Sequence, residues 1–296
     1  MGLAVSGGPD SLALLLLVHE VAPRNFAVAT VDHGLRPEAA QEATVVGAIC
    51  ADRGIPHHTL TLSLSKGSAV QERARTARYG ALSQWCADQG LAALVTAHHA
   101  DDQAETMVMR LNRKVGLRGL AGMRAVAVVP GTPTLPLIRP LLEWRRTDLA
   151  TIVEDAGLCA VHDPSNCDTA YERVRVRAAL TSSNAFDASA FAATAHHLAE
   201  ADEALEWAVA QLWQSVGQQD QSFTWNPAID LPPVLALRIL ERILAGFGSA
   251  VPRGTSLLRW LATLRANGVA TLGGVKGDAR RAPWRFTREP ERKRQS

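Results

Sequence analysis

The fold of this chain depends first on the stretch Leu3-Ala4-Val5-Ser6-Gly7-Gly8-Pro9-Asp10-Ser11-Leu12-Ala13-Leu14. A short apolar run meets a polar turn and a second apolar run follows at once, which predicts a strand, a tight loop and a helix. Glycine permits backbone angles that bulkier residues resist, and proline suits the first helical turn. Exposed N–H groups at a helix start, together with the helix dipole, bind phosphate. The stretch therefore predicts a phosphate-binding loop.

This loop differs from the Walker phosphate loop. The Walker pattern needs a lysine before its final serine or threonine, and Asp10 stands there instead, before Ser11. A carboxylate at this place could hold a metal ion that bridges phosphates. The alternative interpretation is a tight turn in which Asp10 and Ser11 only cap a helix.

Length and composition indicate a globular protein. The 296 residues suggest about two domains, at ~150 residues each. With 47% hydrophobic and 20% charged residues, the chain can form a substantial core, and disorder is not expected. The formal net charge is only +2, but residues 109–124 carry five basic side chains and no acidic one. Residues 276–296 carry eight basic side chains against three acidic ones.

Cysteine usage and apolar runs indicate the compartment. The four cysteines, Cys50, Cys86, Cys159 and Cys167, form no CxxC pair, which fits reduced thiols in the cytosol. The longest aliphatic run, residues 12–18, is too short to span a bilayer, and we recognise no targeting segment. We expect a cytoplasmic protein without a membrane partner.

Strands and helices alternate through the first half of the chain. We expect helices over 9–21, 37–54 and 68–90, and strands over 26–31, 55–62 and 91–96. This alternation predicts an α/β fold, in which a parallel sheet carries helices on both faces. Ligands bind such sheets at the carboxyl ends of the strands. Polar clusters follow three of the strands, at residues 6–11, 32–36 and 96–102.

The second half has a different pattern. Residues 126–138 predict a hairpin or an irregular excursion and residues 143–157 a helix, and Asp187 could cap a long helix. Further helices are expected over 232–246 and 256–268, before a short β-like segment at 270–275. We therefore predict a catalytic domain over residues 1–183 and a smaller, mainly helical domain with a basic C-terminal tail over residues 184–296.

The second chemically rich cluster is His98-His99-Ala100-Asp101-Asp102-Gln103-Ala104-Glu105-Thr106. If a helix begins near Ala100, then Asp102 and Glu105 share one face. Two carboxylates beside a phosphate loop can hold Mg²⁺, bind an ammonium group or accept a proton. The alternative is that the acids complement the helix dipole and that the histidines are ordinary turn residues.

Two arginines also lie on one face of an expected helix. Arg75 and Arg78 are three residues apart, and guanidinium groups suit phosphate oxygens. Surface pairing with Glu72 or Asp88 explains the same spacing equally well.

The loop over residues 6–11 resembles the SGGxDS loop of the N-type ATP pyrophosphatases, the PP-loop superfamily. Further segments, in order along nearly the whole chain, resemble its tRNA(Ile)-lysidine synthetase family in the short form. Relatives usually have more residues ahead of the first strand, so a truncated start is one expectation. The segments that carry the resemblance are residues 32–36, 75–79, 96–106, 116–123, 139–142 and 163–168.

The resemblance implies a two-step reaction on the wobble cytidine of the isoleucine tRNA with a CAU anticodon. ATP adenylates the C2 carbonyl oxygen and pyrophosphate leaves. The ε-amine of free L-lysine then attacks C2 and displaces AMP, which leaves lysidine. The resemblance also implies Mg²⁺ and, since relatives are often dimers, a homodimer.

The resemblance assigns roles to the ATP-binding residues. The loop would grip the pyrophosphate end of ATP, with Asp10 as a ligand of Mg²⁺, and Arg78 would add positive charge beside the phosphates. The ATP-binding residues are then Ser6, Gly7, Gly8, Pro9, Asp10 and Ser11.

The resemblance also suggests the lysine and tRNA sites, with the second domain, residues 184–296, recognising the tRNA. Asp102 and Glu105 would hold the lysine ammonium, and one of them, or His98 or His99, would accept a proton from the amine. The resemblance favours Asp102 as this base, and spacing alone does not choose. The candidates for contacts with tRNA phosphates are Arg110, Arg113, Lys114, Arg118, Arg173, Arg175 and Arg177.

Three other functions are compatible with parts of this pattern. A tRNA thiolase of the same superfamily usually carries a CxxC pair, which this chain lacks. An amidotransferase-type synthetase needs a glutaminase domain, for which the chain has no room. A non-catalytic ATP-binding module would need the loop without the carboxylate cluster.

Overall fold

The computed structural model describes residues 1–32, 34, 38–63, 70–161, 168–183, 185–250, 252 and 255–289. The chain divides into two compact units, Met1–Ala199 and Glu200–Ser296. The division falls inside the long helix α8 (Ala188–Trp213), whereas the predicted domain boundary lies just before this helix, at residues 183 and 184. The predicted domain limits stay a prediction.

The first unit is built on a six-stranded sheet with the order β3-β2-β1-β4-β6-β5. All neighbouring strands are parallel except β5, which runs antiparallel to β6. This arrangement confirms the predicted α/β fold class. The strands are β1 (Gly2–Ala4), β2 (Ala27–Asp32), β3 (His57–Thr61), β4 (Leu94–Val95), β5 (Val126–Val129) and β6 (Thr132–Ile138).

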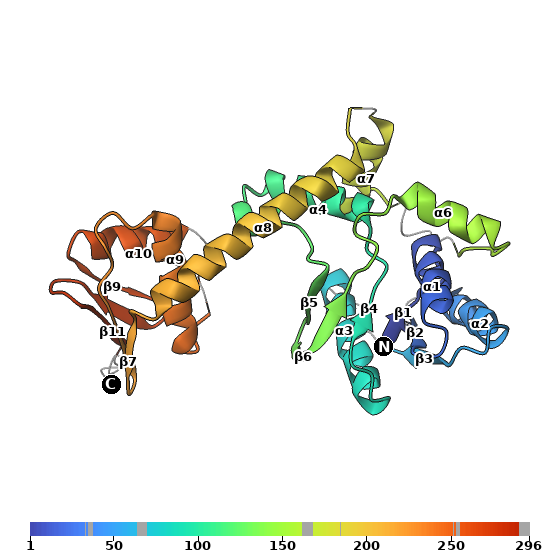
Figure 1. Cartoon of the computed structure of the whole chain (residues 1–296), viewed down its shortest axis with the longest axis horizontal. Coiled ribbons are helices and arrows are strands. Elements are labelled where there is room, and N and C mark those ends of the chain that lie inside the picture. Colours follow the sequence, from blue (N-terminus) through green and yellow to red (C-terminus); the bar gives the residue numbers. More distant parts are fainter. Residues whose placement is uncertain are drawn as a thin grey trace. The chain divides into compact units, whose positions relative to one another are not determined.

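Helices cover both faces of this sheet (Figure 1). On one face, α1, α2 and α6 share a core with buried strand residues such as Leu3, Val28 and Val95. On the other face, α3 packs on Ala29 and Leu94. The helices of this unit are α1 (Pro9–Val21), α2 (Glu38–Ala51), α3 (Val70–Asp88), α4 (Ala100–Asn112), α5 (Leu117–Leu120), α6 (Arg146–Asp155), α7 (Glu172–Ser182) and the first part of α8.

Two faces are buried because successive strand residues point to opposite sides of a sheet. Leu3 in β1 is fully buried on the α1 side, whereas Ala4 packs on the α3 side. Full burial of a leucine stabilises the fold by about 1.5–3 kcal/mol. A strand of only three residues therefore holds the centre of the sheet.

The strand order positions the candidate site. β1 pairs in parallel with β2 on one side and with β4 on the other, and Leu3 lies opposite both Val28 and Val95. The loops that leave β1 and β4 therefore emerge side by side at one edge. Because the connections from β1 and from β4 lead to opposite directions along the sheet, this is a topological switch point, where α/β sheets bind their ligands.

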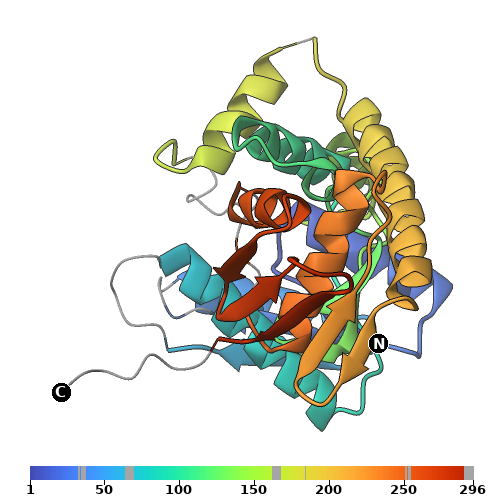
Figure 2. The same cartoon turned by 90° about the vertical axis from the view of Figure 1, so that its left-hand side faces the viewer.

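The second unit contains a five-stranded antiparallel sheet with the order β7-β8-β11-β10-β9. The sequence predicted a mainly helical domain and missed most of this sheet. Helices α9 (Pro233–Gly246) and α10 (Thr255–Arg265) share the core of this unit with residues of the sheet (Figure 2). The strands are β7 (Gly217–Gln219), β8 (Ser222–Trp225), β9 (Val269–Leu272), β10 (Val275–Asp278) and β11 (Trp284–Arg288).

Among the residues that the structure describes, no helix combines the length and the apolar character needed to cross a membrane.

Candidate active site

The phosphate loop is closed by its own serine side chains. Ser11 Oγ accepts a hydrogen bond from the Ser6 amide at 3.1 Å and donates one to the Gly8 carbonyl at 2.9 Å. Gly7 has a φ of +87°, which favours glycine. A Cβ atom on Gly7 would also lie 3.2 Å from Val161 and 3.3 Å from Val46. The backbone thus turns tightly into α1, with Pro9 at the first helical position.

Asp10 lies in the first turn of α1 and faces the second loop. Its Oδ2 atom lies 3.4 Å from His99 Nε2 and 3.7 Å from Arg146 Nη2. Its Oδ1 atom is buried and has no hydrogen-bond partner in the described part of the chain. A buried acceptor that lacks a partner is costly, so this oxygen is suited to a ligand. Carboxylate oxygen is the donor type that Mg²⁺ takes, often with one protein carboxylate and substrate phosphates. Asp10 therefore fits the predicted magnesium role.

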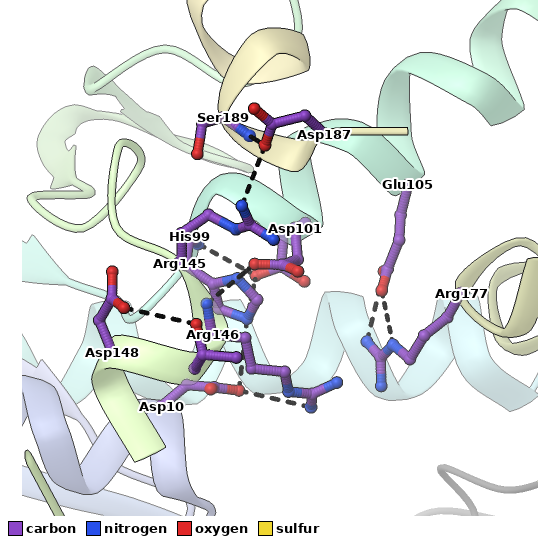
Figure 3. Close-up of polar contacts among 12 residues, drawn as sticks. Asp10, His99, Asp101, Glu105, Arg145, Arg146, Asp148, Arg177, Asp187 and Ser189 are labelled. Atoms are coloured by element: carbon purple, nitrogen blue, oxygen red, sulfur yellow. Dashed lines mark hydrogen bonds and ion pairs between the residues drawn. The ribbon is translucent and has the colours of Figure 1, made fainter. Parts of the chain in front are cut away.

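His99 connects the phosphate loop to the acids of α4 (Figure 3). It precedes α4 and is 1% exposed. Its Nε2 atom lies 3.4 Å from Asp10 and 3.5 Å from Asp102, and its Nδ1 atom lies 3.4 Å from Asp101. Both ring nitrogens face carboxylate oxygens, which is the arrangement of a doubly protonated ring.

The electrostatics of His99 agree with this geometry. Burial alone would lower its pKa, but the contacts with Asp10 and Asp101 and the charge of Asp102 raise the pKa to about 9. His99 is therefore a cation at neutral pH. It cannot then accept the proton of an amine, so it is a poor candidate for the base.

His98 has the opposite electrostatic character. Burial lowers its pKa to about 4; Asp102 opposes this shift, and nearby arginines, Arg139 first, add to it. Its Nδ1 atom lies 2.9 Å from Thr96 Oγ1. Two adjacent histidines thus differ in charge at neutral pH, with a neutral ring at 98 and a charged ring at 99.

The predicted carboxylate pair is present on α4, and arginines of α7 already occupy it. Arg173 donates to Asp102 Oδ1 and to Glu105 Oε2, each at 2.6 Å. Arg177 donates to Glu105 Oε1 at 2.5 Å and to its Oε2 at 3.3 Å. Glu105 is 2% exposed, whereas the Asp102 side chain is 14% exposed. Burial would raise the pKa of Asp102, but His99, Arg173 and His98 together lower it.

Two arginines that the sequence did not single out complete the cluster (Figure 3). The Arg146 amide donates to Asp101 Oδ2 at 2.9 Å, and Arg145 donates to Asp187 Oδ1 at 2.9 Å. Burial would raise the pKa of Asp101. The hydrogen bond with His99 and the one from the Arg146 amide outweigh burial and lower this pKa to about 2. Their position at the start of α6 could have indicated a role for Arg145 and Arg146. Cations at a helix start are unfavourable beside the helix dipole and need acidic partners.

Asp187 performs the predicted capping role. Its Oδ1 atom also accepts a hydrogen bond from the Ser189 amide at 2.9 Å, at the start of α8. The predicted helix cap is confirmed.

Arg78 lies half-buried on α3, and burial lowers its pKa. Its guanidinium carbon is 5.6 Å from the centre of the Tyr79 ring, and that of the exposed Arg75 is 5.2 Å away. Arg78 also lowers the pKa of His98, so its charge acts on the site. Its predicted phosphate contact stays a prediction.

The predicted tRNA-binding residues fall into separate groups. Arg110 donates to the carbonyls of Gly119 and Gly122, and Arg175 donates to those of Thr169 and Ala170. These two hold local backbone, whereas Arg173 and Arg177 bind the carboxylates of α4. The remaining three, Arg113, Lys114 and Arg118, are all exposed. Of these, Arg113 forms an ion pair with Glu172.

Two predicted clusters lie largely outside the described residues. Of residues 32–36, the structure describes only 32 and 34, and of residues 163–168 only 168. Asp32 Oδ1 accepts a hydrogen bond from the Gly34 amide at 2.8 Å, at the end of β2.

Comparison with known proteins shows the family to which the chain belongs. Residues 1–184 match the PP-loop domain family. The tRNA(Ile)-lysidine synthase of Novosphingobium aromaticivorans is 65% identical over 289 residues, which cover 98% of this chain and 89% of that protein. The chain belongs to the tRNA(Ile)-lysidine synthase family. The resemblance found in the sequence is thereby confirmed.

Other relatives agree with this family. The tRNA(Ile)-lysidine synthase of Zymomonas mobilis subsp. mobilis is 39% identical over 297 residues, 99% of this chain and 90% of that protein. Among solved structures, the U34-tRNA thiolase NcsA from Methanococcus maripaludis, with its [4Fe-4S] cluster, superposes with a TM-score of 0.54. The superposition covers 66% of this chain and 69% of that chain at 16% identity, so this likeness shows the fold alone.

Proposed function

We propose that this chain is an ATP-dependent ligase that joins free lysine to a cytidine of tRNA(Ile) and so forms lysidine. Membership of the tRNA(Ile)-lysidine synthase family supports this activity. The observation in the structure that carries the proposal is the connection through His99. It brings Asp10 of the phosphate loop and Asp102 of α4 within 3.5 Å of one ring nitrogen. A nucleotide on the loop and an amine on α4 would therefore be neighbours.

In the first step, residues 6–11 hold the phosphates of ATP against the start of α1, where N–H groups and the helix dipole favour negative charge. Asp10, through its buried Oδ1 atom, would hold Mg²⁺, which would neutralise part of the charge of the departing pyrophosphate. Arg146 supplies further positive charge beside Asp10, and Arg78 supplies positive charge beside His98. The adenylated atom is the C2 oxygen of the wobble cytidine.

In the second step, Asp102 and Glu105 bind the ammonium of lysine and the amine loses a proton. Asp102 is the better candidate for the base, because it is more exposed and binds one arginine. Glu105 is almost fully buried and binds two. His98 is the second candidate, since burial keeps its ring neutral. The neutral amine then attacks C2 and displaces AMP.

The tRNA would be the isoleucine tRNA with a CAU anticodon. Arg113, Lys114 and Arg118 are exposed around the end of α4 and on α5, so they are the better candidates for its phosphates. Such contacts release counterions, and binding should weaken with salt.

Two further proposals concern the protein in the cell. We place it in the cytoplasm, where ATP, lysine and tRNA meet, and we propose a homodimer. Light scattering coupled to size-exclusion chromatography would measure the mass in solution, and a monomer mass would contradict the dimer.

The activity is tested by incubating the protein with ATP, Mg²⁺, radiolabelled lysine and the CAU isoleucine tRNA. We expect label in the tRNA and pyrophosphate release in equal amounts. Folded protein that binds ATP but releases no pyrophosphate would instead be a non-catalytic nucleotide-binding module.

A further inference from the structure

Arg173 lies where the ammonium group of lysine is expected. One guanidinium bridges both carboxylates of α4, with Nη2 on Asp102 and Nε on Glu105, each at 2.6 Å. A cation already satisfies the two acids that the lysine ammonium would use. A second cation placed there would be repelled by the first, so lysine and Arg173 compete for one place.

Arg173 and its neighbour Arg177 are not equivalent. Of the two α4 carboxylates, Arg177 contacts Glu105 and not Asp102 in the described part of the chain, and its side chain is 24% exposed. Arg173 contacts both carboxylates, and its side chain is 39% exposed. Arg173 can therefore leave towards solvent while Arg177 stays and keeps the buried Glu105 charge paired, which avoids the cost of a bare buried carboxylate.

A phosphate group is the natural alternative partner for a displaced guanidinium. Arginine binds phosphate oxygens through two parallel N–H groups as well as it binds a carboxylate. The phosphate loop is close, because His99 lies within 3.5 Å of both Asp10 and Asp102. ATP and tRNA both carry phosphate and are both substrates of the proposed reaction.

We propose that Arg173 sets the order of substrate binding. Its guanidinium keeps free lysine out of the site formed by Asp102 and Glu105 until a phosphate-bearing substrate draws the guanidinium away. The inference rests on the proposed function, in which these two carboxylates hold lysine. Substrate binding is then ordered, and lysine binds tightly only after ATP or tRNA. The ε-amine of lysine then enters the site only when ATP or tRNA, which form the adenylated cytidine that it attacks, is already bound.

Equilibrium dialysis of radiolabelled lysine against the full chain tests this order. The arms are protein alone, protein with Mg²⁺ and α,β-methylene ATP, protein with the CAU isoleucine tRNA, and protein with both. We expect the lysine affinity of the wild type to rise at least tenfold in an arm that supplies the required phosphate. The ATP and tRNA arms identify which substrate supplies it.

Two variants sharpen the measurement. Arg173→Gln removes the competing cation, so it should bind lysine at the raised affinity without either substrate. Arg24→Gln is the control with the same loss of charge, because Arg24 is exposed on the first unit and is not among the residues proposed to bind ATP, lysine or tRNA. Its lysine affinity in the absence of tRNA should equal that of the wild type. The wild-type arms decide the order even if a variant folds poorly.

Three results would overturn the inference. Wild-type lysine affinity that is independent of ATP and tRNA would do so, as would weaker lysine binding by Arg173→Gln. If Asp102→Asn leaves the lysine affinity of the fully loaded enzyme unchanged, lysine binds elsewhere and the proposed lysine site fails as well. Transfer of label into tRNA by the wild type is a separate readout, so failure of the ordering is distinguishable from failure of the activity.

Discussion

At the scale of single residues, the site depends on a division of charge between neighbouring side chains. His98 and His99 are adjacent in sequence, yet one is neutral and the other charged at neutral pH. Asp101 and Asp102 both have a lowered pKa, but their partners differ, since Asp101 accepts a hydrogen bond from the Arg146 amide and Asp102 accepts one from the Arg173 guanidinium. The residue types were predictable from sequence. Their charge states were not, because they depend on which groups the fold brings within 4 Å.

The charge of His99 should appear in the pH dependence of stability. Its pKa rises from 6.5 to about 9 on folding, so the folded state binds the proton more tightly. This contribution is complete below pH 6.5 and is lost as the pH rises through about 9, and its size is roughly 3 kcal/mol. Urea unfolding between pH 6 and 10 should show this loss in the wild type.

His99→Gln should flatten the alkaline part of that profile, whereas His98→Gln should keep it. His98 has a pKa lowered to about 4, so its own contribution is lost in the acid range, between 6.5 and about 4. An alkaline slope that survives in His99→Gln would show that another group causes it.

The proposed base is tested by Asp102→Asn. The amide cannot accept the amine proton or hold the ammonium charge, so lysine transfer should fall at least about 100-fold. Binding of tRNA, measured by filter retention, should stay within about twofold. Loss of tRNA affinity, or unchanged turnover, would remove Asp102 from this role.

At the scale of elements, the loop and the helix that follows it were predictable. Helix α1 begins at Pro9, as predicted, and residues 126–138 form the predicted hairpin of β5 and β6. Local signals suffice for these elements, because a turn and the runs beside it are contiguous in sequence.

The sheet of the second unit was missed for a physical reason. β7 has three residues, and β10 contains glycine and aspartate, which are depleted in strands. β8 pairs with β11, so partners about sixty residues apart define the sheet. Likewise, nothing local indicated that Arg173 and Arg177 face α4 rather than solvent, because that contact exists only once α4 and α7 pack together.

The turn before α1 supports a prediction with a matched control. Gly7→Ala places a Cβ atom at a φ of +87°, 3.2 Å from Val161, whereas Gly54 has a φ of +66° and open space around it. Both substitutions should lower the free energy of unfolding by about 1–2 kcal/mol. Only Gly7→Ala should also raise the KM for ATP, since it distorts the phosphate loop. Steady-state kinetics separate the two, and an unchanged KM for Gly7→Ala would contradict the role of the loop.

At the scale of the whole molecule, the net charge of +2 hides the groups that would bind RNA. The exposed cations near the end of α4 and on α5 are the proposed contacts for tRNA phosphates. Removing the charge of Lys114 or Arg118 should reduce the slope of log K for tRNA against log salt by about 1 each. A charge-removing change at the exposed Arg24 on the first unit is the control and should leave the slope unchanged. Equal slopes in all variants would place the RNA elsewhere.

The fold, the phosphate loop and the acids of α4 all support the proposal that the chain attaches lysine to the wobble cytidine. Nucleoside analysis of the CAU isoleucine tRNA after incubation with ATP, Mg²⁺ and lysine tests it most directly. Lysidine should replace cytidine at the wobble position, and a tRNA with uridine there should stay unmodified. Unmodified cytidine after incubation with folded protein, or lysine found at another nucleotide, would contradict the proposed activity.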